Sequence, residues 1–115
     1  MPVTGAHVLL YTPQAETLRE VLRDALGWGH VDAGEGWLIF ALPPAELGVH
    51  PTEGEPRHEL SLICDDVAAT AAELEAKGIE VRGEPEDLGF GVGTRIVLPG
   101  GADVLLYEPR HPTAI

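Results

Sequence analysis

Polar side chains recur at alternating positions in several segments that have the composition of β-strands. They are His7, Glu46, His50, Glu59, Ser61, Asp103 and Tyr107. Alternate residues of a strand point to the same side of a sheet, and the apolar residues between them are expected to pack against helices. The polar set should therefore gather on the helix-free side. Imidazole and carboxylate groups meeting there are suitable ligands for a divalent metal, although such a face can also be merely solvated.

One structural pattern occurs twice in the chain and would position these residues. The clearer copy spans Arg57–Val81 and predicts a short strand, an acidic turn, a helix over Val67–Lys77 and a glycine stop. The weaker copy begins with a strand over Ala6–Tyr11, followed by a helix over Gln14–Leu26. The repetition indicates two related modules.

Each copy continues with further strands separated by Pro- or Gly-rich turns. These strands are expected at Trp37–Leu42, Ala45–His50, Ile79–Arg82, Thr94–Leu98 and Asp103–Tyr107. A glycine-rich loop is expected over 83–93. The prediction is one α+β domain over residues 1–115. It consists of two βαβββ modules, about 5–51 and 57–109, whose half-barrels form a curved mixed sheet with one main helix per module.

Charge and composition narrow the classes of function. Nineteen acidic residues against seven basic ones give a net charge of −12, which disfavours nucleic acid. The charge suits a cationic ligand, or simply an acidic surface that aids solubility. The sequence contains no apolar run near the ~20 residues of a membrane helix and no signal-peptide pattern. Its single cysteine, Cys64, fits a reducing cytoplasm, and sheet edges that need protection indicate a homodimer.

The paired pattern resembles the vicinal oxygen chelate superfamily, which includes glyoxalase I, extradiol dioxygenases, fosfomycin-modifying enzymes and bleomycin-resistance proteins. The resemblance rests on His7 and Leu10 in the opening strand and on the motifs CDDVAATAAELEAKGIEV and PGGADVLLYEP. It implies a divalent metal (Zn, Ni, Mn or Fe) held by His7, Glu46 and Glu59. The fourth ligand position, usually an acid, falls on Leu105.

Two functions follow from this resemblance. The first is a metal-dependent lyase, isomerase or dioxygenase, in which the ion binds two neighbouring oxygens of a small substrate and His50 or Glu59 moves a proton. The alternative is a metal-free small-molecule binding protein, such as a resistance protein that sequesters a bleomycin-like cationic drug. Four residues are candidates for substrate binding: Trp37, Phe90, Asp103 and Tyr107. His111 is interpreted as a loop residue.

Overall fold

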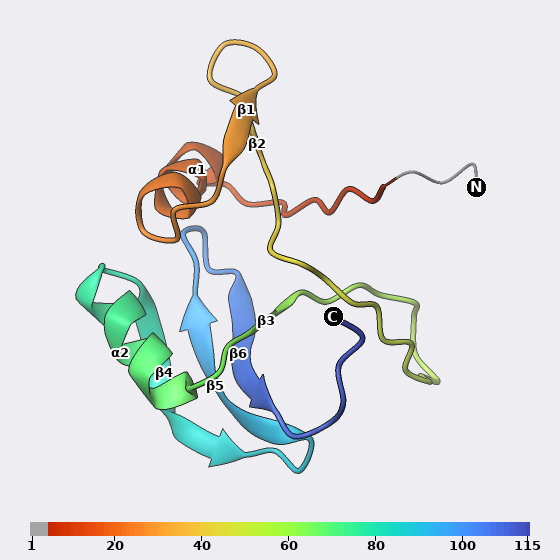
Figure 1. Ribbon diagram of the computed structural model, residues 1–115. Helices are drawn as coiled ribbons and strands as arrows, with labels where there is room; N and C mark the ends of the chain where they lie inside the picture. The colour runs from red at the N-terminus through yellow and green to blue at the C-terminus, as the bar shows by residue number, and fades with distance from the viewer. Residues whose placement is uncertain (1–4) are drawn as a thin grey trace.

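The computed structural model describes residues 5–115, so residues 1–4 of the predicted domain lie outside the described part. Two helices and six strands follow one another along the chain (Figure 1). They are α1 (Ala15–Asp24), β1 (His30–Asp32), β2 (Leu38–Phe40), β3 (Ser61–Ile63), α2 (Val67–Ala76), β4 (Glu80–Asp87), β5 (Gly91–Val97) and β6 (Asp103–Pro109). The α+β class predicted from the sequence is confirmed.

The second module forms a four-stranded sheet with the order β3-β6-β5-β4. The strands β3 and β6 are parallel, and the other neighbours are antiparallel. Helix α2 covers one face (Figure 1). The core between them contains Val67 and Leu74 from α2, Ile96 from β5, and Val104 and Leu106 from β6. Burying these apolar side chains supplies the main force that holds helix and sheet together.

Local contacts fix the start of α2. The Asp66 carboxylate accepts a hydrogen bond from the Ala69 amide at 3.0 Å, as expected of an N-cap. A second carboxylate, Glu108 on β6, accepts from the Val67 amide at 3.0 Å. Two otherwise unpaired amides of the first turn are therefore satisfied, and one of these contacts ties the helix to the sheet.

The first module contains α1 and the β1–β2 hairpin, which lie beside the turn between β5 and β6 (Figure 1). Leu18 of α1 is buried in the same core as α2. The Thr12 hydroxyl donates to the Pro99 carbonyl at 3.0 Å. A β-carbon at Gly100 would overlap the Thr12 side chain, so glycine allows this close approach between the modules.

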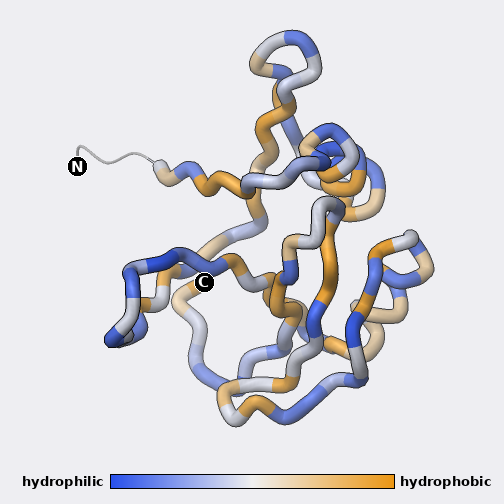
Figure 2. The backbone as a smooth tube through the Cα atoms, turned by 180° about the vertical axis from the view of Figure 1, so that it is seen from behind, coloured by the Kyte–Doolittle hydropathy of each residue, from blue (hydrophilic) through white to orange (hydrophobic). Residues whose placement is uncertain are grey.

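Two segments predicted as strands, Ala6–Tyr11 and Ala45–His50, are extended but belong to neither sheet. Their apolar side chains face solvent: Val8 is 52% exposed, Leu47 90% and Val49 88%. Figure 2 shows the apolar stretch of the N-terminal segment standing outside the core. A strand requires backbone partners, and the described part of the chain provides none for these segments. The sheet is consequently not closed.

Strand β4 is longer than the predicted Ile79–Arg82, because half of the expected loop continues the strand. The pairing of β4 with β5 shifts between Arg82 and Glu86, where Gly83 has a φ of +79°. The buried Thr94 hydroxyl donates toward the carbonyls of Arg82 and Gly83 at 3.0 and 3.3 Å. This bulge lets one strand contain both a glycine and a proline.

Candidate functional site

The helix-free face of the four-stranded sheet is defined by the alternation of β5 and β6. On β5, the buried Thr94 and Ile96 occupy alternate positions directed toward the helix side. The opposite side therefore carries Gly91, Gly93, Arg95 and Val97. The register sets Gly93 opposite Tyr107, Arg95 opposite Leu105, and Val97 opposite Asp103. Ile63 of β3 pairs with Tyr107 from the other side.

An aromatic pair occupies one end of this face. The rings of Phe90 and Tyr107 meet edge to face, with centroids 5.4 Å apart and an interplanar angle of 82°. A β-carbon at Gly93 would lie 2.8 Å from the Leu88 side chain and 3.0 Å from that of Leu105. Because Gly93 has no β-carbon, the side chains of Leu88 and Leu105 can pack over β5 at this position. Phe90 remains 48% exposed, so an apolar surface is available to a flat ligand.

Polar groups surround the Tyr107 ring. Its hydroxyl is 3.2 Å from Nε2 of His111, and Nδ1 of His111 is 2.8 Å from the Pro112 carbonyl. A carbonyl only accepts, so Nδ1 carries a proton, and in the neutral ring Nε2 then accepts from the tyrosine hydroxyl. Burial, and then the negative charge of Glu46, raise the pKa of Tyr107. The phenol therefore stays protonated at neutral pH.

The half-buried Glu46 is the point at which the first module reaches this face. Its Oε1 accepts a hydrogen bond from the Ala114 amide at 2.7 Å, which fixes the segment around Glu46 to the chain after β6. A depression of about 500 Å³ adjoins this contact, between the residues that precede Glu46 and the C-terminal residues. Its lining includes Pro43, Pro44 and Ile63. Ile63 connects this depression to Tyr107 through the β3–β6 pairing.

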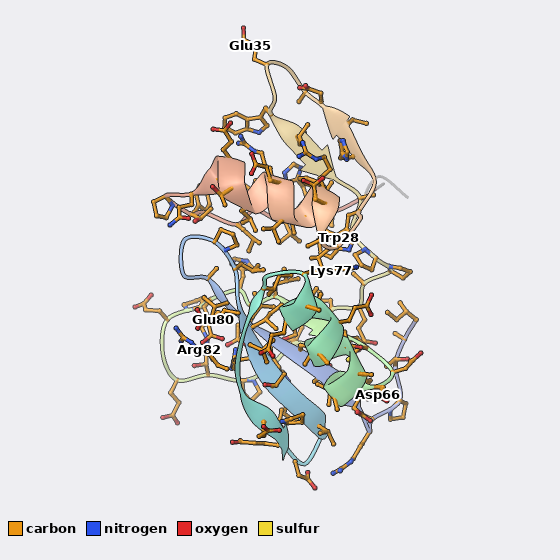
Figure 3. The ribbon with its side chains drawn as sticks, turned by 90° about the vertical axis from the view of Figure 1, so that its left-hand side faces the viewer. Trp28, Glu35, Asp66, Lys77, Glu80 and Arg82 are labelled. Atoms are coloured by element: carbon orange, nitrogen blue, oxygen red, sulfur yellow. The ribbon has the colours of Figure 1, made fainter. Side chains whose placement is uncertain are left out.

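Charged side chains occupy the other end of the face. Asp103 lies 3.5 Å from Arg95 and 3.7 Å from Arg82. Arg82 also donates to Glu80 at 3.1 Å. In Figure 3 the labelled Glu80 and Arg82 project from the side of the sheet that α2 does not cover. Arg82 and Arg95 are direct cross-strand partners, so two guanidinium groups share one region of the surface.

Several residues predicted for the site lie elsewhere. His7 and His50 are exposed on the two extended segments. Glu59, just before β3, accepts from Arg57 at 3.2 Å and has a 70% exposed side chain. Trp37, immediately before β2, lies under the Arg19 guanidinium, whose carbon is 4.7 Å from the centroid of the tryptophan ring. The predicted residues that do share one face are Glu46, Phe90, Asp103 and Tyr107, together with Ser61, which pairs with Leu105.

The predicted metal site requires at least three ligands that meet at one point. Across residues 5–115, no three His, Cys, Asp or Glu side chains come close enough to share an ion. His7, Glu46 and Glu59 therefore do not form a ligand set within one chain. At the fourth ligand position, Leu105 presents hydrocarbon between Tyr107 and Asp103. The single chain does not fit a divalent metal in the predicted manner, and the metal site stays a prediction.

Two residues of this face were missed by the sequence reasoning. His111 follows Tyr107 by four residues across Pro109. The Arg110 amide donates to the Phe90 carbonyl at 2.8 Å and extends the β5–β6 pairing by one residue, and the chain bends at residues 110 and 111. Arg95 was detectable, because it alternates with Thr94 and Ile96 in a strand that was predicted. A charge in the middle of an apolar strand was the signal.

Comparison with known proteins places the fold. No protein-family model matches the sequence, and no curated protein matches it significantly. Among solved structures, TnmS3, an antibiotic binding protein from Streptomyces sp. CB03234, is 22% identical with a TM-score of 0.67, over 95% of this chain and 98% of that one. A lactoylglutathione lyase from Agrobacterium tumefaciens is 17% identical with a TM-score of 0.63, over 94% and 96% of the two chains.

A third similar structure is a glyoxalase/bleomycin resistance protein/dioxygenase superfamily member from Sphaerobacter thermophilus. It is 20% identical with a TM-score of 0.63, over 94% of this chain and 99% of that one. The chain thus has the fold of this superfamily, and the fold resemblance drawn from the sequence is confirmed. No helix within residues 5–115 has the length and apolar character needed to cross a membrane.

Proposed function

We propose that this protein binds a small molecule with a flat apolar part on the helix-free face of its second module, without a metal ion. The Phe90–Tyr107 pair carries this proposal, because it offers exposed aromatic surface beside a polar rim. Leu105, at a position where the resemblance predicts a metal-binding acid, extends that apolar surface. The similarity to an antibiotic binding protein agrees with this role.

A ligand titration followed by amide resonances tests this proposal. Planar aromatic compounds such as 2-naphthamide should shift the Gly91 and Gly93 signals, because these residues lie in the floor beside Tyr107. Phe90→Ala should weaken binding about tenfold, as expected for removal of a large aromatic contact. Shifts confined to other regions, or binding unaffected by Phe90→Ala, would contradict the proposed site.

The protein is further proposed to act as a homodimer. The chain exposes 8454 Å², whereas a compact monomer of 12.2 kDa exposes about 6,000 Å². The excess of about 2,400 Å² per chain corresponds to about 4,800 Å² for two chains, which is in the range that obligate homodimers bury. The two unpaired extended segments account for part of it. A second copy would supply the backbone partners that these segments lack.

A metal-dependent enzyme is the second candidate function. One observation favours it: Glu46, a predicted ligand, reaches the same face as Tyr107. The missing ligands would then come from a second copy, since His7 and Glu59 lie on exposed segments. Metal analysis of untagged protein separates the candidates. Stoichiometric divalent metal that is lost in His7→Ala supports the enzyme, and protein that remains metal-free after loading with Zn²⁺, Ni²⁺, Mn²⁺ or Fe²⁺ supports the binding protein.

A further inference from the structure

We infer that the ligand of the helix-free face is a planar aromatic carboxylate, held by stacking at Phe90 and Tyr107 and by an ion pair with Arg95. This inference rests on the proposed binding function and names the chemical class of the ligand. The sequence has only seven basic residues against nineteen acidic ones. Two of those seven, Arg82 and Arg95, are nevertheless neighbours on this face.

Arg95 is the residue available to a ligand. Arg82 already donates to Glu80 at 3.1 Å, and it lies on the edge strand β4. Arg95 lies on the inner strand β5, and within residues 5–115 its one acidic partner at ion-pair distance is Asp103, at 3.5 Å. Within residues 5–115, Arg95 and Asp103 form no hydrogen bond. A guanidinium has five N–H donors in a planar fork that matches a carboxylate.

The spacing of the face suits a ligand with two unlike ends. Tyr107 is opposite Gly93, and Arg95 follows two residues along β5, which corresponds to about 7 Å. Leu105 is opposite Arg95 and provides hydrocarbon between the aromatic pair and the charge. A ring system on Tyr107 with a carboxylate directed along β5 would make both contacts. A neutral aromatic ligand would leave the guanidinium without a partner.

The overall charge of −12 does not oppose this assignment. Charges on an exposed surface are screened beyond about 8 Å at physiological ionic strength, so neighbours decide the local preference. Around Arg95 these neighbours are Arg82, Asp103 and Glu80. A ligand carboxylate would compete with Asp103 for Arg95, while Asp103 keeps its second partner, Arg82. When the ligand carboxylate pairs with Arg95, both Asp103 and Glu80 still have Arg82 as a cationic partner.

A charge series on one ring tests the assignment with the native full-length protein. The probes are 2-naphthoate, 2-naphthamide and 2-naphthylmethylammonium, which share a ring and carry a negative, zero or positive charge. Affinities come from amide shifts of Gly91, Gly93 and Arg95. We expect 2-naphthoate to bind about fivefold more tightly than the amide and the ammonium compound to bind most weakly. This ranking requires no variant.

Matched substitutions then locate the charge effect. Arg95→Gln should weaken binding of 2-naphthoate more than that of 2-naphthamide and so abolish the advantage of the carboxylate. Arg95→Lys should restore part of it, because lysine keeps the charge without the planar fork. Arg23→Gln removes the same charge from α1, where Arg23 pairs with Asp24, and should change nothing. Thermal unfolding of each variant shows that it is folded.

The outcomes separate this inference from the binding function on which it rests. Equal binding of all three probes, with each weakened by Phe90→Ala, overturns the carboxylate assignment and leaves the binding function standing. If the ammonium compound binds most tightly, the carboxylate assignment is again overturned, the binding function stands, and a cationic ligand is favoured. Absence of site-specific shifts with every probe overturns both proposals.

Discussion

The Tyr107 hydroxyl lies 3.2 Å from Nε2 of His111, and this contact joins the last strand of the sheet to the chain that follows it. The two rings are tilted by 40°, with centroids 6.0 Å apart. The neighbouring Glu46 connects the same chain end to the first module through the Ala114 amide. Tyr107 is therefore surrounded by groups from three separate parts of the sequence, namely Phe90, His111 and Glu46.

The ionisation of Tyr107 provides the first prediction. Burial, followed by the charge of Glu46, raises the pKa of Tyr107 above the ordinary value of a tyrosine, so the folded protein holds this proton more tightly than the unfolded chain. The resulting stability is fully present below about pH 10 and is lost as pH rises through the folded-state pKa. In a Tyr11→Phe background, tyrosinate absorbance should report a midpoint above 10.

Glu46→Gln is the matched variant for that measurement. Removing the carboxylate charge should lower the midpoint of Tyr107, while burial keeps it above the value for the unfolded chain. An unchanged midpoint would show that Glu46 does not lie beside Tyr107 in solution.

A second prediction concerns the glycines of β5. A β-carbon at Gly91 would overlap the Glu108 carbonyl, which belongs to the backbone of β6. Gly91→Ala should therefore lower the free energy of unfolding by about 1–3 kcal/mol, because the strands must separate. Gly29→Ala is the control, since a β-carbon there meets nothing within 4 Å. Equal unfolding midpoints in denaturant for both variants would refute this account.

The cap of α2 gives a third prediction. Asp66→Ala removes the acceptor of the Ala69 amide and should cost about 1 kcal/mol of stability. Asp65→Ala removes an equal charge from the preceding residue, which makes no side-chain cap. Chemical denaturation of the two variants should rank Asp66→Ala as the less stable protein. Equal losses of stability in the two variants would mean that charge, and not the capping hydrogen bond, stabilises this helix end.

A fourth prediction addresses assembly. Leu47 and Val49 are 90% and 88% exposed, and a homodimer would bury them. Leu47→Asp combined with Val49→Asp should raise the dimer dissociation constant at least about tenfold, because burial of each side chain contributes roughly 1.5–3 kcal/mol. Sedimentation velocity measures this change. Thr52→Asp adds a charge two residues after the segment Ala45–His50 and should leave the dimer intact, whereas a monomeric native protein would refute the homodimer.

The sequence predicted the fold well where short-range patterns decide the structure. Both helices were predicted from the sequence, and the acidic turn predicted before the second helix contains the observed cap, Asp66. The faces of β6 were also correct: Val104 and Leu106 are buried under α2, and Asp103 and Tyr107 are on the other side. These assignments needed only alternation and the presence of a covering helix.

The unpaired segments and the site were harder to predict, because they depend on contacts between distant residues. Alternation in Ala45–His50 indicates a strand but does not supply a partner for it. Similarly, His7 and Glu59 occupy equivalent positions of the repeat, yet equivalence does not bring two side chains together. The pairing of Tyr107 with His111 depends on how the chain turns after Pro109, and no periodic pattern encodes this turn.

The outer strand β4 has a consequence for how the sheet ends. This edge strand carries four exposed acidic residues, Glu80, Glu84, Glu86 and Asp87, together with Pro85 and the irregular pairing near Gly83. A second copy of β4 that paired along this sheet edge would bring like charges together, and it would meet Pro85, which lacks an amide hydrogen. Filament growth from this edge is thereby opposed, and crowded molecules of the chain can remain dispersed.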